Sequence, residues 1–158
     1  MIQRPTRKSL PHLVPNWVPD GSVYFITLNA LPRGEDPLLP HAPALWDSIL
    51  FNTDRGLWWP HLLVVMPDHL HGLFGFSREA AIQKAVTDWK HFNGHTFSIT
   101  WQRDFFEHRL RGDESFDEKA FYIRMNPVRR GLCAKPEEWP YTWSLAASGP
   151  RRSAGPTS

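Results

Sequence analysis

Alternating apolar and polar positions divide the chain into predicted strands. Runs rich in β-branched and aromatic residues, with turn residues at both ends, are typical of strands. The run Val23-Tyr24-Phe25-Ile26-Thr27-Leu28, between Asp20-Gly21 and Pro32, is the strongest example. On this basis we predict strands over Gly21–Leu31, Leu57–Met66, His69–Phe76 and Trp101–Leu110.

Apolar residues spaced three and four apart predict three helices. The first covers Ala42–Thr53 and ends before Gly56. The second follows Ser77, a plausible cap, and is expected to stop at Asn93-Gly94, because this pair favours turns. The third opens with the capping box Ser115-Phe116-Asp117-Glu118 and closes at Pro127 and Gly131. The proline-rich segment that follows is expected to be a tail.

The order of these elements is strand, helix, strand, strand, helix, strand, helix. This order matches the split βαβ pattern of ferredoxin-like folds. We therefore expect an α+β, ferredoxin-like (RRM-like) antiparallel sheet with helices packed on it, in which the third strand lies inside the sheet. Residues 1–20 are expected to form an irregular basic, proline-rich arm, residues 21–147 the globular domain, and residues 148–158 a flexible tail.

Length and charge narrow the class of protein. With 158 residues and 18.3 kDa, the chain is expected to form one domain with a sizeable core. The formal net charge is only +2, but basic residues cluster, as at Arg4, Arg7 and Lys8, which permits binding to nucleic acid. Eight tryptophans supply flat surfaces on which unpaired bases could stack, although most tryptophans in proteins belong to the core.

The expected location is the cytoplasm. The single cysteine, Cys133, cannot form an intramolecular disulfide, which fits a reducing compartment. No apolar run approaches the ~20 residues of a membrane span, and no signal peptide is visible at the N-terminus. We therefore expect no membrane association.

Two histidines flank a single leucine in Met66-Pro67-Asp68-His69-Leu70-His71. In a strand, His69 and His71 point to the same face, ~6 to 7 Å apart at the backbone, close enough to hold one metal ion. Two structural histidines remain an equal alternative at this point. A cupin-like metal site is disfavoured, because the next carboxylate, Glu79, falls in a predicted helix.

The last predicted helix carries a second candidate group. Phe116, Ala120 and Ile123 form an apolar stripe that should face the sheet. Lys119, Tyr122 and Asn126 form a different row, in which Tyr122 and Asn126 are one turn apart. A tyrosine opposite two histidines suggests a metal-assisted nucleophile, and from spacing alone an ordinary amphipathic tyrosine stays the alternative.

Ordered motifs along the chain resemble those of the single-tyrosine HUH transposases, and most closely the REP-associated tyrosine transposase branch. The similarity extends from about Gly21 to Ser144. The motifs that carry it are Met66-Pro67-Asp68-His69-Leu70-His71, Trp101-Gln102, Phe106-Glu107-His108-Arg109, Tyr122-Ile123-Arg124-Met125-Asn126-Pro127-Val128-Arg129-Arg130-Gly131-Leu132 and Trp139-Pro140-Tyr141-Thr142-Trp143-Ser144.

This resemblance implies roles for individual residues. His69 and His71 would be metal ligands, Tyr122 the nucleophile and Asn126 a third polar ligand, although Pro127 disfavours helical geometry at Asn126. The metal implied is Mg²⁺, with Mn²⁺ as an alternative that imidazole ligands also suit. Asp68 stands where many relatives have asparagine, and it adds a negative charge beside the metal ligands.

The resemblance also implies a substrate and a reaction. The substrate would be single-stranded DNA next to a hairpin, as in repeated extragenic palindromes, cleaved to a 5′-phosphotyrosine and a free 3′-hydroxyl. Candidate phosphate contacts are Arg4, Arg7, Lys8, Arg129 and Arg130. The protein would act as a monomer or a homodimer.

Two other classes of function remain open from the sequence. One is a hairpin-binding module of the same fold that has lost its chemistry. The other is an RNA-binding ferredoxin-like domain, which would carry aromatic and basic residues on adjacent strands. The histidines on the third predicted strand, together with Tyr122, favour the enzyme over both.

Overall fold

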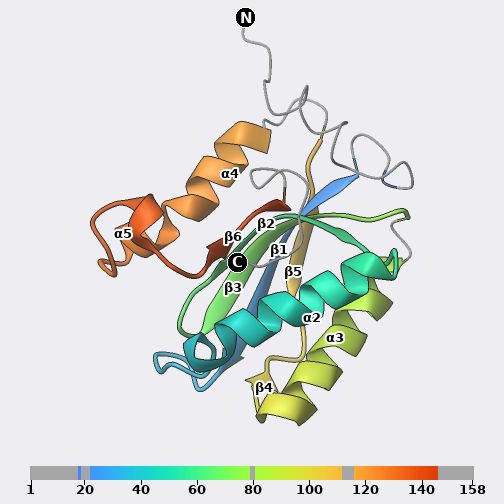
Figure 1. Ribbon diagram of the computed structural model, residues 1–158, viewed down its shortest axis with the longest axis horizontal. Helices are drawn as coiled ribbons and strands as arrows, with labels where there is room; N and C mark the ends of the chain where they lie inside the picture. Colours follow the sequence, from blue (N-terminus) through green and yellow to red (C-terminus); the bar gives the residue numbers. More distant parts are fainter. Residues whose placement is uncertain (1–17, 19–21, 79–80, 112–115, 146–158) are drawn as a thin grey trace, which may run out of the picture.

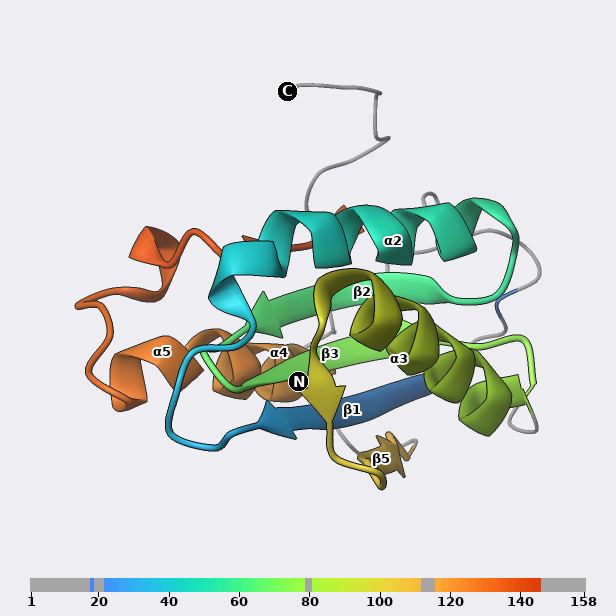
Figure 2. The same cartoon turned by 90° about the horizontal axis from the view of Figure 1, so that it is seen from below.

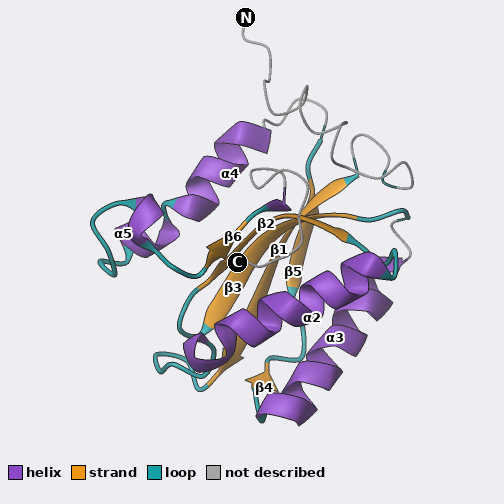
Figure 3. Ribbon diagram, in the orientation of Figure 1, coloured by secondary structure: helices purple, strands orange, loops and turns teal. Residues whose placement is uncertain are grey.

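An antiparallel sheet of six strands forms the centre of the molecule (Figures 1 and 3). The computed structural model describes residues 18, 22–78, 81–111 and 116–145. The order across the sheet is β4-β1-β3-β2-β6, and β5 also pairs with β1. The strands are β1 (Val23–Leu31), β2 (Trp59–Val65), β3 (His69–Gly75), β4 (Thr100–Trp101), β5 (Phe106–Arg109) and β6 (Thr142–Trp143).

Helices cover the two faces of this sheet unequally. The helices are α2 (Ala42–Asp54), α3 (Ile82–Phe97), α4 (Phe116–Arg124) and the short α5 (Asn126–Arg129), with 3₁₀ turns at Leu39–His41 and Pro136–Glu138. The helices α2 and α3 pack on one face, whereas α4 packs on the opposite face against β2 and β3 (Figure 2). We call this second face the histidine face, because it carries His69 and His71.

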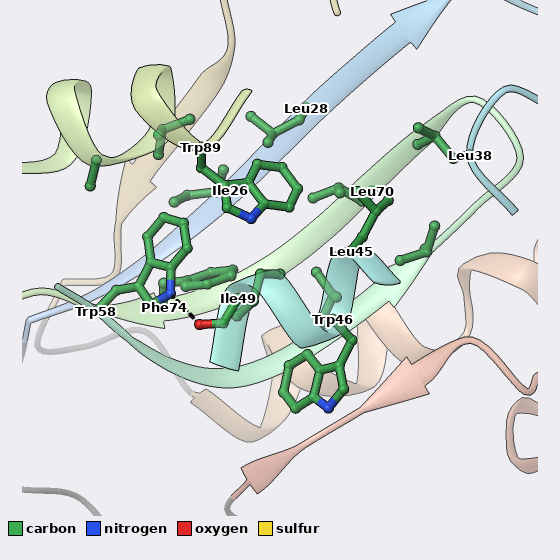
Figure 4. Packing of buried hydrophobic residues seen from close by; sticks show 14 of the residues in the cluster. Ile26, Leu28, Leu38, Leu45, Trp46, Ile49, Trp58, Leu70, Phe74 and Trp89 are labelled. Carbon is green, nitrogen blue, oxygen red and sulfur yellow. Dashed lines mark hydrogen bonds between the residues drawn. The ribbon is translucent and has the colours of Figure 1, made fainter. Parts of the chain in front are cut away.

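The larger of two hydrophobic clusters lies under α2 and α3. Leu45 and Ile49 of α2 and Trp89 of α3 pack there against strand residues such as Leu70 (Figure 4). The indole N–H of Trp58 donates a 3.1 Å hydrogen bond to the carbonyl oxygen of Ile49, so its buried polar group is satisfied. The smaller cluster lies under α4 on the histidine face.

The predicted fold class is confirmed. β3 lies between β1 and β2, and both pairings are antiparallel. The last predicted strand pairs with β1, which gives the strand order of a ferredoxin-like sheet. Each histidine of β3 is therefore held between two neighbouring strands, which makes its position rigid.

Helix α3 continues through Asn93-Gly94, where the sequence predicted its end. Asn93 is fully buried, and its side-chain amide donates to the carbonyl oxygen of Trp89 at 2.9 Å. A Cβ at Gly94 would lie 2.9 Å from the carbonyl oxygen of Ile99, so glycine is needed for this close approach. The pair therefore serves packing, and the helix ends at Phe97, before Ser98 in the left-handed conformation.

The predicted strand Trp101–Leu110 is split into β4 and β5. Trp101 pairs with Ala30 of β1, and Phe106 pairs with Thr27 of β1. The chain from Trp101 to Phe106 is two residues longer than the stretch of β1 that it pairs with. The ammonium group of Lys90 donates to the carbonyl oxygens of Gln102 and Arg103 at 2.7 and 3.0 Å. The extra residues therefore loop out and are held by a buried lysine from α3.

The proline-rich chain after Gly131, where the sequence predicted no regular element, forms the 3₁₀ turn Pro136–Glu138 and the strand β6 before Leu145. Trp143 of β6 stacks on Trp46 of α2 with ring centroids 5.7 Å apart, and Trp139 donates to the carbonyl oxygen of Val65. The contacts of these tryptophans thus hold the segment on the sheet, although its prolines disfavour regular structure. Of the predicted domain boundaries, the arm and the tail fall almost wholly outside the described residues and stay predictions.

His61 is a buried histidine at an irregularity in the β2 pairing. It is 3% exposed, and neither ring nitrogen has a hydrogen-bond partner among the described residues. Burial lowers the pKa of His61 to about 4 from 6.5. As the pH falls, the unfolded chain binds this proton before the folded chain does, so stability is lost between about pH 6.5 and pH 4.

We predict that His61→Leu removes part of the acid sensitivity of the fold. The loss attributable to His61 is roughly 3 kcal/mol across this pH range, at 1.36 kcal/mol per pKa unit. Urea unfolding of the wild type and His61→Leu at pH 7 and pH 4.5 measures it. His91→Leu, at an exposed position of α3, is the matched control. If the wild type, His61→Leu and His91→Leu lose the same free energy of unfolding between pH 7 and pH 4.5, His61 is not the source of the acid sensitivity.

None of the helices in the described residues combines the length and the apolar character that crossing a bilayer requires.

Candidate functional site

The two histidines of β3 lie side by side on the histidine face. His69 is opposite Asn29 of β1, and His71 is opposite Thr27. Because side chains alternate along a strand, both imidazoles point to the same face, as the sequence predicted. Their ring centroids are 4.9 Å apart, at an angle of 77°. This separation lets both rings contact one small ligand.

The Nδ1 atom of each histidine is already engaged. His69 Nδ1 lies 2.8 Å from a carboxylate oxygen of Asp68, and His71 Nδ1 lies 2.8 Å from the hydroxyl of Thr27. Because a carboxylate accepts, His69 donates through Nδ1, and its Nε2 carries the lone pair. Neither Nε2 is among the buried unpartnered atoms of the described residues. The hydrogen bonds of both rings within the described residues use Nδ1, so each Nε2 is left to contact a ligand.

Asp68 links His69 to the loop after β1. Its second oxygen accepts from the Nε of Arg33 at 2.9 Å and from the backbone N–H of Gly34 at 2.8 Å. Burial alone would raise the pKa of Asp68, but hydrogen bonds from Gly34, His69 and Arg33 lower it to about 2. The carboxylate is therefore ionised at neutral pH and orients His69 from behind.

Burial and nearby positive charge keep both imidazoles neutral. Burial lowers the pKa of His71 to about 3, and repulsion from His69 when that ring is protonated, and from Arg130 and Arg129, adds to this effect. Burial also lowers the pKa of His69, against the opposing effect of Asp68. A neutral imidazole is the form that binds a metal ion.

Helix α4 presents Tyr122 beside the same face. Its predicted apolar stripe packs on the sheet, with Ile123 fully buried and Phe116 and Ala120 partly buried. Tyr122 lies outside this stripe and is 51% exposed. The amphipathic pattern of the helix thus places the tyrosine at the edge of the contact with the sheet, where a ligand from solvent can reach it.

Two cationic side chains flank the Tyr122 ring. The guanidinium carbon of Arg129 lies 4.3 Å from the ring centroid, and Arg129 also donates to the backbone carbonyl of Tyr122 at 2.7 Å. The Nζ of Lys119 lies 5.8 Å from the same ring and 5.3 Å from the ring of Phe25. Since Phe25 also contacts His71, with centroids 5.6 Å apart, a continuous set of contacts joins Tyr122 to the histidines.

The remaining predicted site residues are placed less directly. Asn126 is 9% exposed and is the first residue of α5, separated from the end of α4 only by Met125. It is therefore helical although it precedes Pro127, contrary to the expectation from the sequence. No hydrogen bond joins the Asn126 side chain to either histidine within the described residues. Arg130 is close enough for its charge to lower the pKa of both histidines. Arg4, Arg7 and Lys8 lie outside the described residues.

The donor set suits a partly open metal site. Among the described residues, no three histidine, cysteine or carboxylate side chains are grouped to hold an ion. The site therefore offers two imidazole nitrogens, and the predicted third ligand, Asn126, stays a prediction. Two oriented imidazoles with accessible Nε2 atoms fit a divalent ion whose other positions are left for water or substrate.

Sequence reasoning gave no role at this site to three residues that contribute to it. Lys119 belongs to the predicted row of Tyr122, so its spacing could have identified it. Arg33 lies far from Asp68 in sequence and is brought to it only by the fold. Phe25 had no visible signal, because its contact with His71 depends on the pairing register of β1 and β3.

Comparison with known proteins identifies relatives of this chain. No protein-family model matches the chain. A REP-associated tyrosine transposase of Escherichia coli K12 is 26% identical over 130 residues, covering 77% of this chain and 76% of that protein. A second relative, from Haemophilus influenzae, is 22% identical over 139 residues, covering 77% and 79%.

A solved structure has the same fold. It is a REP-associated tyrosine transposase bound to a REP hairpin, and it covers 82% of this chain and 80% of its own at a TM-score of 0.63 and 22% identity. The similarity extends across most of the sheet and helices rather than a single motif. The chain is thus similar in sequence to REP-associated tyrosine transposases over about three quarters of its length, and it shares the fold of a solved member.

Proposed function

We propose that the protein is a metal-dependent endonuclease and strand transferase that acts on single-stranded DNA next to a hairpin. One observation carries this proposal: His69 and His71, with accessible Nε2 atoms, share a face with the exposed Tyr122, whose ring is flanked by Lys119 and Arg129. The similarity to transposases, one of them bound to a REP hairpin, supports the choice of substrate.

Tyr122 is the proposed nucleophile. Its hydroxyl oxygen forms a bond to phosphorus and loses its proton, while the bond from phosphorus to the 3′ oxygen breaks and that oxygen becomes a hydroxyl. The protein then holds the 5′-phosphate covalently. Attack by another 3′-hydroxyl reverses these steps and joins the strands, so no nucleotide cofactor is required.

Localisation to the cytoplasm remains a prediction.

Cationic side chains would bind and orient the phosphates. Arg129 holds the backbone and ring of Tyr122 and would keep its positive charge beside the scissile phosphate. Lys119, between Phe25 and Tyr122, and Arg130 add charge on the same side. Such contacts stabilise the negative charge that increases as the phosphate is attacked.

His69, His71 and Asn126 would hold a Mg²⁺ or Mn²⁺ ion. When bound, the ion would polarise the scissile phosphate and help to orient it. The protein's part is to fix the imidazoles, which it does through Asp68 behind His69 and Thr27 behind His71.

The test of the proposal is a search for a covalent product. The full chain is incubated with single-stranded DNA hairpins from the source genome, with Mg²⁺, Mn²⁺ or a chelator, and the products are separated on a denaturing gel. We expect a protein–DNA adduct that requires the metal. Hairpin binding with no adduct would instead identify a binding module that has lost its chemistry.

We further predict that Asp68 positions His69 for the metal. Asp68→Ala removes the acceptor of His69 Nδ1, so we expect metal affinity to fall ~10- to 100-fold. Asp68→Asn keeps an acceptor oxygen and should lose less. Mn²⁺ titration followed by electron paramagnetic resonance measures the affinity. Asp88→Ala, which removes an exposed carboxylate of α3, is the control, and equal affinity in all variants would contradict this role.

A further inference from the structure

Only half of the histidine face is covered by a helix. Among the described residues, α4 packs on this face chiefly against β2 and β3, and over β1 it reaches Phe25 through Lys119. In Figure 1, α4 lies on the β2 and β6 side of the sheet, whereas β5 lies on the other side of β1. The open half therefore extends from the histidines to an edge strand.

The open half carries an exposed aromatic side chain. Phe106 of β5 is opposite Thr27, which places it on the histidine face, and it is 53% exposed. Its ring stacks on the ring of His108 at 6.5 Å and 23°, and meets the edge of Phe25 at 5.7 Å and 70°. A single exposed phenylalanine is ordinary, but this ring is fixed by two aromatic neighbours.

Phe106 is connected to the proposed reaction site through Phe25. The Phe25 ring contacts Phe106 on one side and His71 on the other, with centroid separations of 5.7 and 5.6 Å. A stacked single strand advances about 3.4 Å per nucleotide, so roughly three nucleotides or fewer span these two contacts. A base near the phosphate held at the histidines would thus come within reach of Phe106.

We propose that Phe106, supported by Phe25 and His108, stacks on one unpaired base of the single strand that flanks the hairpin. The inference rests on the proposed function and adds a base-binding position to it. Stacking on an aromatic ring requires an accessible base face, which a paired base inside a duplex does not offer. The positive charge of Lys119, 5.3 Å from the Phe25 ring, lies beside this position and suits the strand's phosphate.

This chemistry selects unpaired DNA and leaves its sequence open. Every base has a face that can stack on an aromatic ring, so the contact tolerates different bases. Phe106 would therefore fix the strand's position relative to Tyr122 rather than read the sequence. That role makes it a positioning residue for the proposed cleavage.

The test compares binding of two DNA probes without metal, so that no cleavage occurs. One probe is a hairpin from a palindromic repeat of the source genome with single-stranded flanks, and the other is the same hairpin without flanks. We expect Phe106→Ala to bind the flanked probe about 5- to 140-fold more weakly, the equivalent of one stacked base, and to bind the unflanked probe as the wild type does. Phe106→Trp should restore the affinity.

An abasic scan of the flanks locates the contact. Removing one base at a time should weaken binding by the wild type at one position, and Phe106→Ala should be insensitive at that position. Phe92→Ala is the matched control, because Phe92 is 56% exposed on α3, on the opposite face of the sheet. It should bind both probes as the wild type does.

The outcomes separate this inference from the proposed function. If the wild type binds the flanked hairpin and Phe106→Ala binds it equally well, the inference is overturned and the proposed function stands. If the wild type binds neither probe, both are overturned. Equal losses on both probes would show that Phe106 acts through the fold, which also overturns the inference.

Discussion

Replacing Tyr122 with phenylalanine is expected to abolish the protein–DNA adduct while hairpin binding stays within about twofold of the wild type. The substitution removes the proposed nucleophilic oxygen and nothing else. The ring that remains keeps its contacts with Arg129 at 4.3 Å and Lys119 at 5.8 Å. A denaturing gel measures the adduct, and a mobility shift without metal measures binding.

The chain contains its own control for this experiment. It has three tyrosines, of which Tyr24 is buried and Tyr141 is partly exposed beside Trp139. Tyr141→Phe removes a hydroxyl of the same kind at a position outside the proposed site, and it should form the adduct at the wild-type level. An adduct that persists in Tyr122→Phe, or disappears in Tyr141→Phe, would assign the nucleophile elsewhere.

Local periodicity was enough to predict which way the side chains of the candidate site face. The two-residue repeat of a strand puts His69 and His71 on one face, and the helical stripe ending in Ile123 leaves Tyr122 outside the sheet contact. Both results depend on neighbouring residues alone. For the same reason the α+β order of elements could be predicted, because each element has its own pattern.

What the sequence could not predict depends on residues that meet only in the folded chain. Asn93-Gly94 favours a turn locally, but burial of Asn93 and the approach of Ile99 keep it helical. In the sequence, Lys90 looks like an ordinary helix residue. Only the folded chain brings it to the carbonyl oxygens of Gln102 and Arg103, at the point where the last predicted strand is interrupted. Tertiary contacts of this kind override local preference, and no single window of the sequence contains them.

The aromatic pair Phe25 and Phe106 near the site also could not be predicted, because these residues meet only in the folded chain. An RNA-binding ferredoxin-like domain would carry aromatic residues on adjacent strands, and the sequence shows histidines on the third predicted strand instead. Phe25 and Phe106 do lie on adjacent strands of the histidine face, but their contact follows from the β1 and β5 register. The histidines and the aromatic rings thus form neighbouring parts of one face.

His71→Ala and His69→Ala are each expected to weaken divalent metal binding by at least about 100-fold and to abolish the adduct. Loss of a partner behind a ligand already costs ~10- to 100-fold, so loss of one of two imidazole ligands should cost more. Mn²⁺ titration measures binding independently of catalysis. Thermal unfolding checks that His71→Ala, which also loses the bond to Thr27, remains folded.

Two further variants make this result specific to the metal. His91→Ala removes an exposed imidazole from α3 and should bind Mn²⁺ as the wild type does. Thr27→Val keeps His71 but removes the hydroxyl that holds its Nδ1, so its affinity should fall between those of the wild type and His71→Ala. We expect this graded loss of Mn²⁺ affinity if the ion binds at Nε2 of His71. His71→Ala removes that atom, whereas Thr27→Val only loosens the orientation of the ring that carries it. Wild-type Mn²⁺ affinity in both histidine variants would leave two structural histidines and remove the metal from the proposed reaction.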